Sequence, residues 1–69
     1  MKIEVVKAKG SNFTPSGLML EYAKAHNIQT HRDKYGSLTL DLGFAAKYDH
    51  WEITDNLDGT ETVSVFMTV

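Results

Sequence analysis

Apolar residues recur along the chain with two different periods, and the change between them separates a helix from several strands. Between residues 15 and 26 they return every three to four positions, so that Leu18, Tyr22 and Ala25 fall on one helical stripe. Elsewhere, beginning with residues 2–8, short runs rich in β-branched residues are bounded by turn-forming residues, which is typical of strands. The pattern predicts the element order β-α-β-β-β-β.

Both ends of the predicted helix carry residues suited to helix termini. A threonine at position 14 can accept a hydrogen bond from a free backbone N–H, and Pro15 has no N–H to leave unpaired in the first turn. At the other end Asn27 tolerates the left-handed conformation in which many helices finish, and Ile28 can fold back over the last turn. We therefore expect one helix from Pro15 to His26.

Two tetrads, Asp33–Gly36 and Asn56–Gly59, share the same turn chemistry, with Asp or Asn first and glycine last. This order suits a type I turn followed by a left-handed glycine, a common three-residue hairpin loop. Each turn fixes a register, because Asp33 should pair with Ser37 and Asn56 with Thr60. The resulting apolar pairs are Thr30–Leu40 and Ile28–Leu42 in the first hairpin, and Ile53–Val63 and Trp51–Val65 in the second.

These registers predict a single α+β domain spanning residues 1–69. One helix packs on one face of a mainly antiparallel sheet of four to five strands, and the first strand lies either inside the sheet or at its edge. The predicted core consists of Leu18, Met19, Tyr22, Ile28, Leu38, Leu40, Leu42, Trp51, Ile53, Val63, Val65 and Met67.

Composition narrows the class of protein. The chain has 69 residues, a mass of 7.7 kDa and 42% hydrophobic residues, and it has no cysteine for a disulfide or a thiolate metal site. No apolar run is long enough to span a membrane, and Met1–Glu4 leads into no apolar stretch of the kind a signal peptide needs. We expect a cytoplasmic globular domain without membrane contact.

Charge is distributed unevenly. The net charge is −2, but residues 1–35 carry +3 and residues 36–69 carry −5. This balance argues against a general nucleic-acid binder, which needs clustered Lys and Arg for phosphate contacts. The asymmetry can steer a charged partner, or the strands of the two halves can interleave and mix the signs.

Candidate catalytic and metal-binding residues do not converge in the sequence. His26, His31 and His50 occupy a helix end, a hairpin and a strand, so a hydrolase or nuclease built on His and Asp stays a minor alternative. His50 and Glu52 share one strand face, but Asp49 points to the other, which leaves too few ligands for a closed metal site. We expect no catalytic site, metal or cofactor.

The outer face of the last hairpin is the most informative surface. The register that turns Trp51 inward turns Tyr48 and His50 outward, with the predicted cross-strand pairs Tyr48–Thr68 and His50–Phe66. Aromatic side chains among hydroxyls and acids are typical of protein contact surfaces. The alternative is that Phe44 or the first strand covers Phe66. The predicted partner-binding residues are Tyr48, His50, Glu52, Ser64, Phe66 and Thr68.

The sequence therefore favours a non-enzymatic interaction module that binds a larger protein. Acidic residues around the aromatics favour a basic protein and count against the alternative, nucleic-acid stacking on Tyr48, His50 and Phe66. We also expect Val63–Val69 to form an unguarded sheet edge able to pair with a partner strand or, in a homodimer, with a second copy. Size alone suggests an inhibitor or adaptor of a larger host machine, of the kind that viruses and mobile elements encode.

Overall fold

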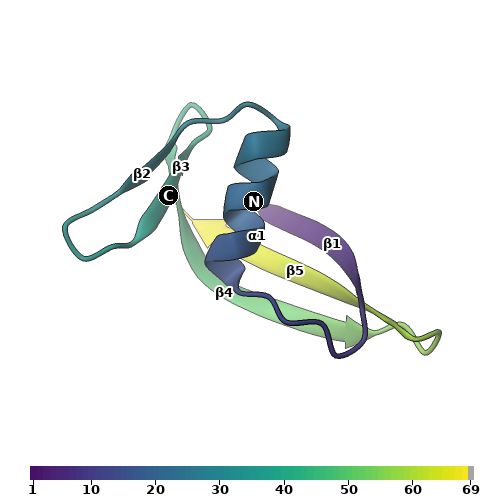
Figure 1. Ribbon diagram of the computed structural model, residues 1–69. Coiled ribbons are helices and arrows are strands. Elements are labelled where there is room, and N and C mark those ends of the chain that lie inside the picture. The colour runs from purple at the N-terminus through teal and green to yellow at the C-terminus, as the bar shows by residue number, and fades with distance from the viewer. Residues whose placement is uncertain (69) are drawn as a thin grey trace.

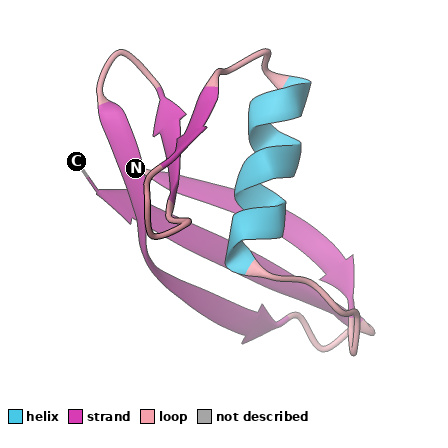
Figure 2. Cartoon of the chain, turned by 60° about the vertical axis from the view of Figure 1, so that its left-hand side comes forward, coloured by secondary structure: helices cyan, strands magenta, loops and turns pink. Residues whose placement is uncertain are grey.

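The computed structural model describes residues 1–68, which form one helix packed against a five-stranded antiparallel sheet (Figures 1 and 2). The predicted α+β fold and element order are confirmed. In chain order the elements are β1 (Lys2–Ala8), α1 (Pro15–Ala25), β2 (Thr30–Arg32), β3 (Leu38–Asp41), β4 (Ala45–Asp55) and β5 (Thr60–Thr68). Within the described range no helix has the length and apolar character needed to cross a membrane.

Helix α1 begins and ends as its sequence predicts. The Thr14 hydroxyl accepts a hydrogen bond of 3.0 Å from the Gly17 amide, and Pro15 occupies the first turn. At the other end Asn27 is left-handed, with φ 55°, and the Ile28 amide donates to the Ala23 carbonyl at 2.8 Å. The hydrogen bonds at the two ends of α1 satisfy terminal backbone groups that would otherwise lack partners.

The strand order is β1-β5-β4-β3-β2, which places the last strand inside the sheet. Strand β1 pairs antiparallel with β5 along its whole length, with Ile3 opposite Val65 and Val5 opposite Val63. The prediction that Val63–Val69 forms a free edge is therefore wrong, because β1 occupies the outer side of that strand; Val69 itself lies outside the described residues. The outermost strands are β1 and β2.

Both hairpins have the register that their turns predict. The Asp33 amide donates to the Ser37 carbonyl, and the Asn56 amide donates to the Thr60 carbonyl, each at 3.1 Å. The confirmed cross-strand pairs are Thr30–Leu40, Ile53–Val63, Trp51–Val65 and His50–Phe66. The predicted pair Ile28–Leu42 lies beyond the ladder, because β2 begins only at Thr30.

The two turns differ in conformation despite their similar sequences. Gly36 and Gly59 are both left-handed, with φ 83° and 88°. In the second turn Leu57 is left-handed as well, with φ 62°, so the type I prediction is wrong there. Side-chain bonds hold this turn instead: the Asp55 carboxylate accepts from the Leu57 amide at 2.9 Å, and the Asp58 carboxylate accepts from the Thr60 amide at 3.0 Å.

A bulge at Asp49 interrupts the alternation of side chains along β4. The register shifts between Tyr48 and His50, and Tyr48 lies opposite Met67 rather than Thr68. One extra residue in a strand reverses the face of every side chain beyond it. The prediction that Tyr48 shares the outer face with His50 is therefore wrong, because Tyr48 lies on the side of the sheet that faces α1.

The core lies between α1 and the middle of the sheet. Its buried members are Ile3, Leu18, Met19, Ala23, Leu38, Leu40, Ala46, Val63, Val65 and Met67. Tyr22, Ile28 and Leu42 are half-buried against this cluster. Trp51 and Ile53 face the helix side as predicted, but they stay 37% and 48% exposed, because α1 runs across the strands and leaves the far part of β4 uncovered (Figures 1 and 2).

Candidate functional site

The sheet face opposite α1, called the outer face here, carries a row of three side chains across three strands. Lys2 of β1 lies beside Phe66 of β5, and Phe66 lies beside His50 of β4. Because directly opposed residues project to the same side of a sheet, the register alone brings these groups together from distant parts of the chain. The row is a cation, a phenyl ring and an imidazole.

The two rings at the centre of this row are stacked. His50 and Phe66 have ring centroids 4.4 Å apart and planes 1° apart. The Lys2 Nζ lies 5.9 Å from the centroid of the Phe66 ring, at the limit of a cation–π contact. Phe66 is half-buried between these neighbours, so the first strand covers part of it while its stack with His50 remains on the surface.

Two carboxylates flank the imidazole. His50 Nδ1 lies 2.8 Å from Asp49 Oδ2, and His50 Nε2 lies 3.8 Å from Glu52 Oε1. All three side chains are more than half exposed. The bulge makes the first contact possible, because it turns Asp49 beside the following residue instead of sending it to the opposite face. Asp49 is thus at hydrogen-bond distance from the imidazole, and Glu52 lies near its other ring nitrogen without a hydrogen bond.

Lys2 is fixed at the other end of the row by Glu4. The Lys2 Nζ lies 2.8 Å from Glu4 Oε1. This hydrogen bond and the charge of Glu4, together with the charge of Glu52, raise the pKa of Lys2 above its usual value. The contact with Glu4 therefore favours the charged form of Lys2.

Most of the predicted partner-binding residues share this surface. His50 and Phe66 form one row, and Ser64 lies in the next row between Glu4 and Glu52. Thr68 is exposed near the end of β5, where it pairs with Lys47. Tyr48 does not belong to this set, because the bulge places it on the other side of the sheet.

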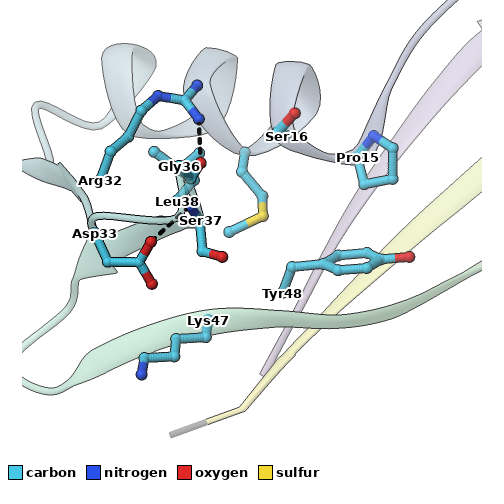
Figure 3. Close-up of a pocket in the computed structure, with 10 residues that line it drawn as sticks. Pro15, Ser16, Arg32, Asp33, Gly36, Ser37, Leu38, Lys47 and Tyr48 are labelled. Atoms are coloured by element: carbon cyan, nitrogen blue, oxygen red, sulfur yellow. Dashed lines mark hydrogen bonds between the residues drawn. The ribbon is translucent and has the colours of Figure 1, made fainter.

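A pocket of about 490 Å³ lies on the α1 side of the sheet, where β3 and β4 separate (Figure 3). Tyr48 and Pro15 face each other across it, and Lys47 is directed away from it. Beside it Arg32 donates to the Gly36 carbonyl at 2.8 Å, and the Asp33 carboxylate accepts from the Ser37 amide at 3.0 Å. The other lining residues are Ser16, Met19 and Leu38.

Sequence reasoning missed this pocket because it missed the bulge. The sequence carries no clear signal for the bulge, which is recognised from the pairing in the structure: Ala46 and Trp51 both face the helix side, yet they are an odd number of residues apart. Residues on one face of a regular strand are separated by even numbers, so an irregularity must lie between these two.

The three histidines lie apart from one another. His26 stacks on Tyr22 at 4.3 Å, and His31 lies in β2, so neither joins His50. Neither this pocket nor the smaller one between β1 and α1 is lined by His50. Within residues 1–68 no three His, Asp or Glu side chains are grouped as metal ligands.

Comparisons of the chain with family models, with curated proteins and with solved structures find no match.

Proposed function

We propose that this protein is a non-enzymatic interaction module that binds a larger protein and inhibits or adapts it. The contact surface is the outer face of the hairpin formed by β4 and β5, with His50, Glu52, Ser64, Phe66 and Thr68. The observation that carries the proposal is the parallel stack of His50 on Phe66, on a sheet face that no helix covers (Figure 2).

Physical chemistry supports a contact role for this stack. Aromatic side chains give large contact areas with few rotatable bonds, and interfaces are enriched in them. The imidazole of the stack is already in contact with Phe66 and with the Asp49 carboxylate, so less conformational freedom is left to lose on binding.

Charge supports a basic partner. The three lysines of the β1 region are already paired: Lys2 with Glu4, Lys7 with Glu21 and Lys9 with Asp55. By contrast, the ion-pair contacts of Asp49 and Glu52 within the described part of the chain are to His50 and to no Lys or Arg. The hairpin therefore presents acids that a basic surface would complement.

The proposal is tested by comparing the proteins captured from native host lysate by the wild-type chain and by three variants. Phe66→Ala and His50→Ala should each abolish recovery of the main partner. Tyr35→Ala is the matched control, because Tyr35 is an aromatic residue 82% exposed in the turn between β2 and β3. Thermal melts check that each variant is folded.

The expected result is a partner captured by the wild type and by Tyr35→Ala but by neither outer-face variant. If both folded outer-face variants recover the partner as the wild type does, the contact surface lies elsewhere and the proposal fails.

A further inference from the structure

Strand β4 has a free edge along most of its length. It pairs with β3 only from Ala45 to Lys47, and within residues 1–68 no strand lies against that side from Tyr48 onward. Figures 1 and 2 both show β4 as the boundary of the sheet there. Such an edge carries unpaired backbone groups that can bond to another strand.

Hydrogen bonds at the start of β5 show which backbone groups of β4 point away from β5. Because Asn56 bonds to Thr60, the antiparallel alternation directs the backbone of residues 60, 62, 64 and 66 toward β4. The Lys9 amide donates to the Gly59 carbonyl, so the backbone groups of residues 61, 63 and 65 point toward β1. The two hydrogen bonds therefore give the same alternation along β5. On β4, the N–H and C=O groups of Trp51, Ile53 and Asp55 therefore point to the free edge.

Three large apolar side chains follow the same edge on the α1 side. Tyr48, Trp51 and Ile53 are 43%, 37% and 48% exposed. The loop before α1 covers only part of this row, with Phe13 edge-on to Trp51 at a centroid distance of 5.3 Å. At the Tyr48 end the row opens into the pocket of about 490 Å³, whose lining includes Met19 and Leu38. An added strand would bury its own apolar side chains along this row.

The other side of the same edge is acidic. Asp49 and Glu52 contact no Lys or Arg within the described residues, and residues 36–69 carry a net charge of −5. A strand laid along β4 would place every second side chain on this face. Lysine or arginine at those positions would meet the two carboxylates.

We propose that β4, from Tyr48 to Asp55, accepts an extended segment of the partner protein as an added antiparallel strand whose apolar residues alternate with Lys or Arg. The inference rests on the proposed function and names the chemistry of the partner segment. Main-chain hydrogen bonds to Trp51, Ile53 and Asp55 give affinity, and the apolar row and the acids select the sequence.

A second copy of the chain fits this edge poorly. Two β4 edges side by side would bring Asp49 and Glu52 of both copies together, and like charges on paired strands repel. The edge also lacks the usual guards, since residues 50–55 contain neither proline nor lysine. The backbone groups of this edge are open to any strand, so the charges beside them select which strand binds.

The probe is a short blocked peptide of alternating valine and lysine, and its binding is measured by calorimetry and by the emission of Trp51, the single tryptophan. Ile53→Pro removes an outward N–H without touching the bonds to β5, so binding should weaken by at least about tenfold. Val6→Pro is the matched control, because the N–H of Val6 also points outward, on the β1 edge. It should bind as the wild type does.

Modified peptides test the same point without changing the protein. Valines opposite Trp51 and Ile53 would direct their N–H groups toward β4, whereas the lysines would direct theirs away. N-methylation at the valines should therefore abolish binding, and N-methylation at the lysines should leave it unchanged. A peptide of alternating valine and glutamate should not bind.

Several results would overturn the proposal. These are equal binding of the lysine and glutamate peptides, loss of binding in Val6→Pro, or loss on methylation at the lysines instead of the valines. A concentration-dependent dimer that disappears in Ile53→Pro would assign the edge to a second copy. If Ile53→Pro captures the partner normally while Phe66→Ala does not, the proposed function stands and this inference fails.

Discussion

Strands β4 and β5 belong to one hairpin and face α1 with matched apolar residues, yet only one of them is buried. Val63 and Val65 are fully buried, whereas their direct partners Ile53 and Trp51 are 48% and 37% exposed. The sequence pattern treats the two strands alike. In the structure they differ for two reasons: α1 leaves the far part of β4 uncovered (Figure 1), and β4 has a strand on only one side past Lys47, whereas β5 has a strand on each side.

The comparison teaches that register and burial are decided by different interactions. Register follows from the turn, which is local, and it holds across the whole hairpin except at the bulge. Burial follows from how many elements surround a position, which is set by strand order. An apolar residue on the correct face of an edge strand remains available for contact with another molecule.

The largest expected effect on stability comes from the pair Ile53–Val63, when threonine replaces one or the other residue in separate variants. Val63→Thr puts a hydroxyl into a fully buried site and should lower the free energy of unfolding by about 2 kcal/mol. Ile53→Thr, at a half-exposed site, should lower it by about 1 kcal/mol or less. Urea denaturation measures both, and equal losses would contradict the distinction between the strands.

An intermediate effect is expected from removing the partial cover of β4. Phe13→Ala deletes the ring that packs edge-on against Trp51 and should cost about 1 kcal/mol in unfolding free energy. The emission of Trp51 should move to longer wavelength, because its indole becomes more hydrated. Phe44→Ala, at a ring that is 42% exposed, is the control and should leave the emission unchanged. If the emission of Phe13→Ala does not shift, Phe13 does not shield Trp51 from water, and the prediction is wrong.

The smallest effect concerns the ion pair that joins the far end of β4 to the loop after β1. The Lys9 Nζ lies 2.7 Å from Asp55 Oδ2, and this bond, with the Leu57 amide, lowers the pKa of Asp55 below its ordinary value of 3.8. A carboxylate with a lowered pKa stabilises the fold above its ordinary pKa, and that contribution is lost as the pH falls through the lowered value. Below about pH 3.8 the free energy of unfolding of Asp55→Asn should therefore fall less steeply with decreasing pH than that of the wild type, as measured by urea denaturation at a series of pH values.

The same pair is exposed, so added salt should weaken its contribution. Lys9→Met should reproduce the effect of Asp55→Asn, and the double variant should lose no more than either single variant. Additive losses would show that the two side chains act independently.

Features that depend on neighbours in sequence could be predicted, and those that depend on distant ones could not. The Thr14 cap, the left-handed Asn27 and the pairing of Asn56 with Thr60 each follow from a few adjacent residues, and all are present. Strand order depends on where β1 docks, and its partners lie more than fifty residues away along the chain. Nothing local in β1 distinguishes a place beside β5 from any other edge.

The candidate site also divides into a part that the local sequence predicts and a part that it does not. His50 opposite Phe66 follows directly from the second turn, but Lys2 joins that row only through the docking of β1. Tyr48 was assigned to the wrong face because alternation was extended through Asp49. The bulge lies just beyond the last residue of β4 that pairs with β3, and the turn of the second hairpin does not specify it.

Strand β5 lies between β1 and β4 in the sheet, although it is the last of the six elements in chain order. Until β5 pairs with it, β1 has no neighbouring strand, and the valines that complete the layer beneath α1 are missing. The helix and the first hairpin depend on contacts between residues that are close in the sequence, whereas the sheet is completed only by contacts between residues far apart. We therefore expect a slow step in folding that is set by the pairing of β1 with β5.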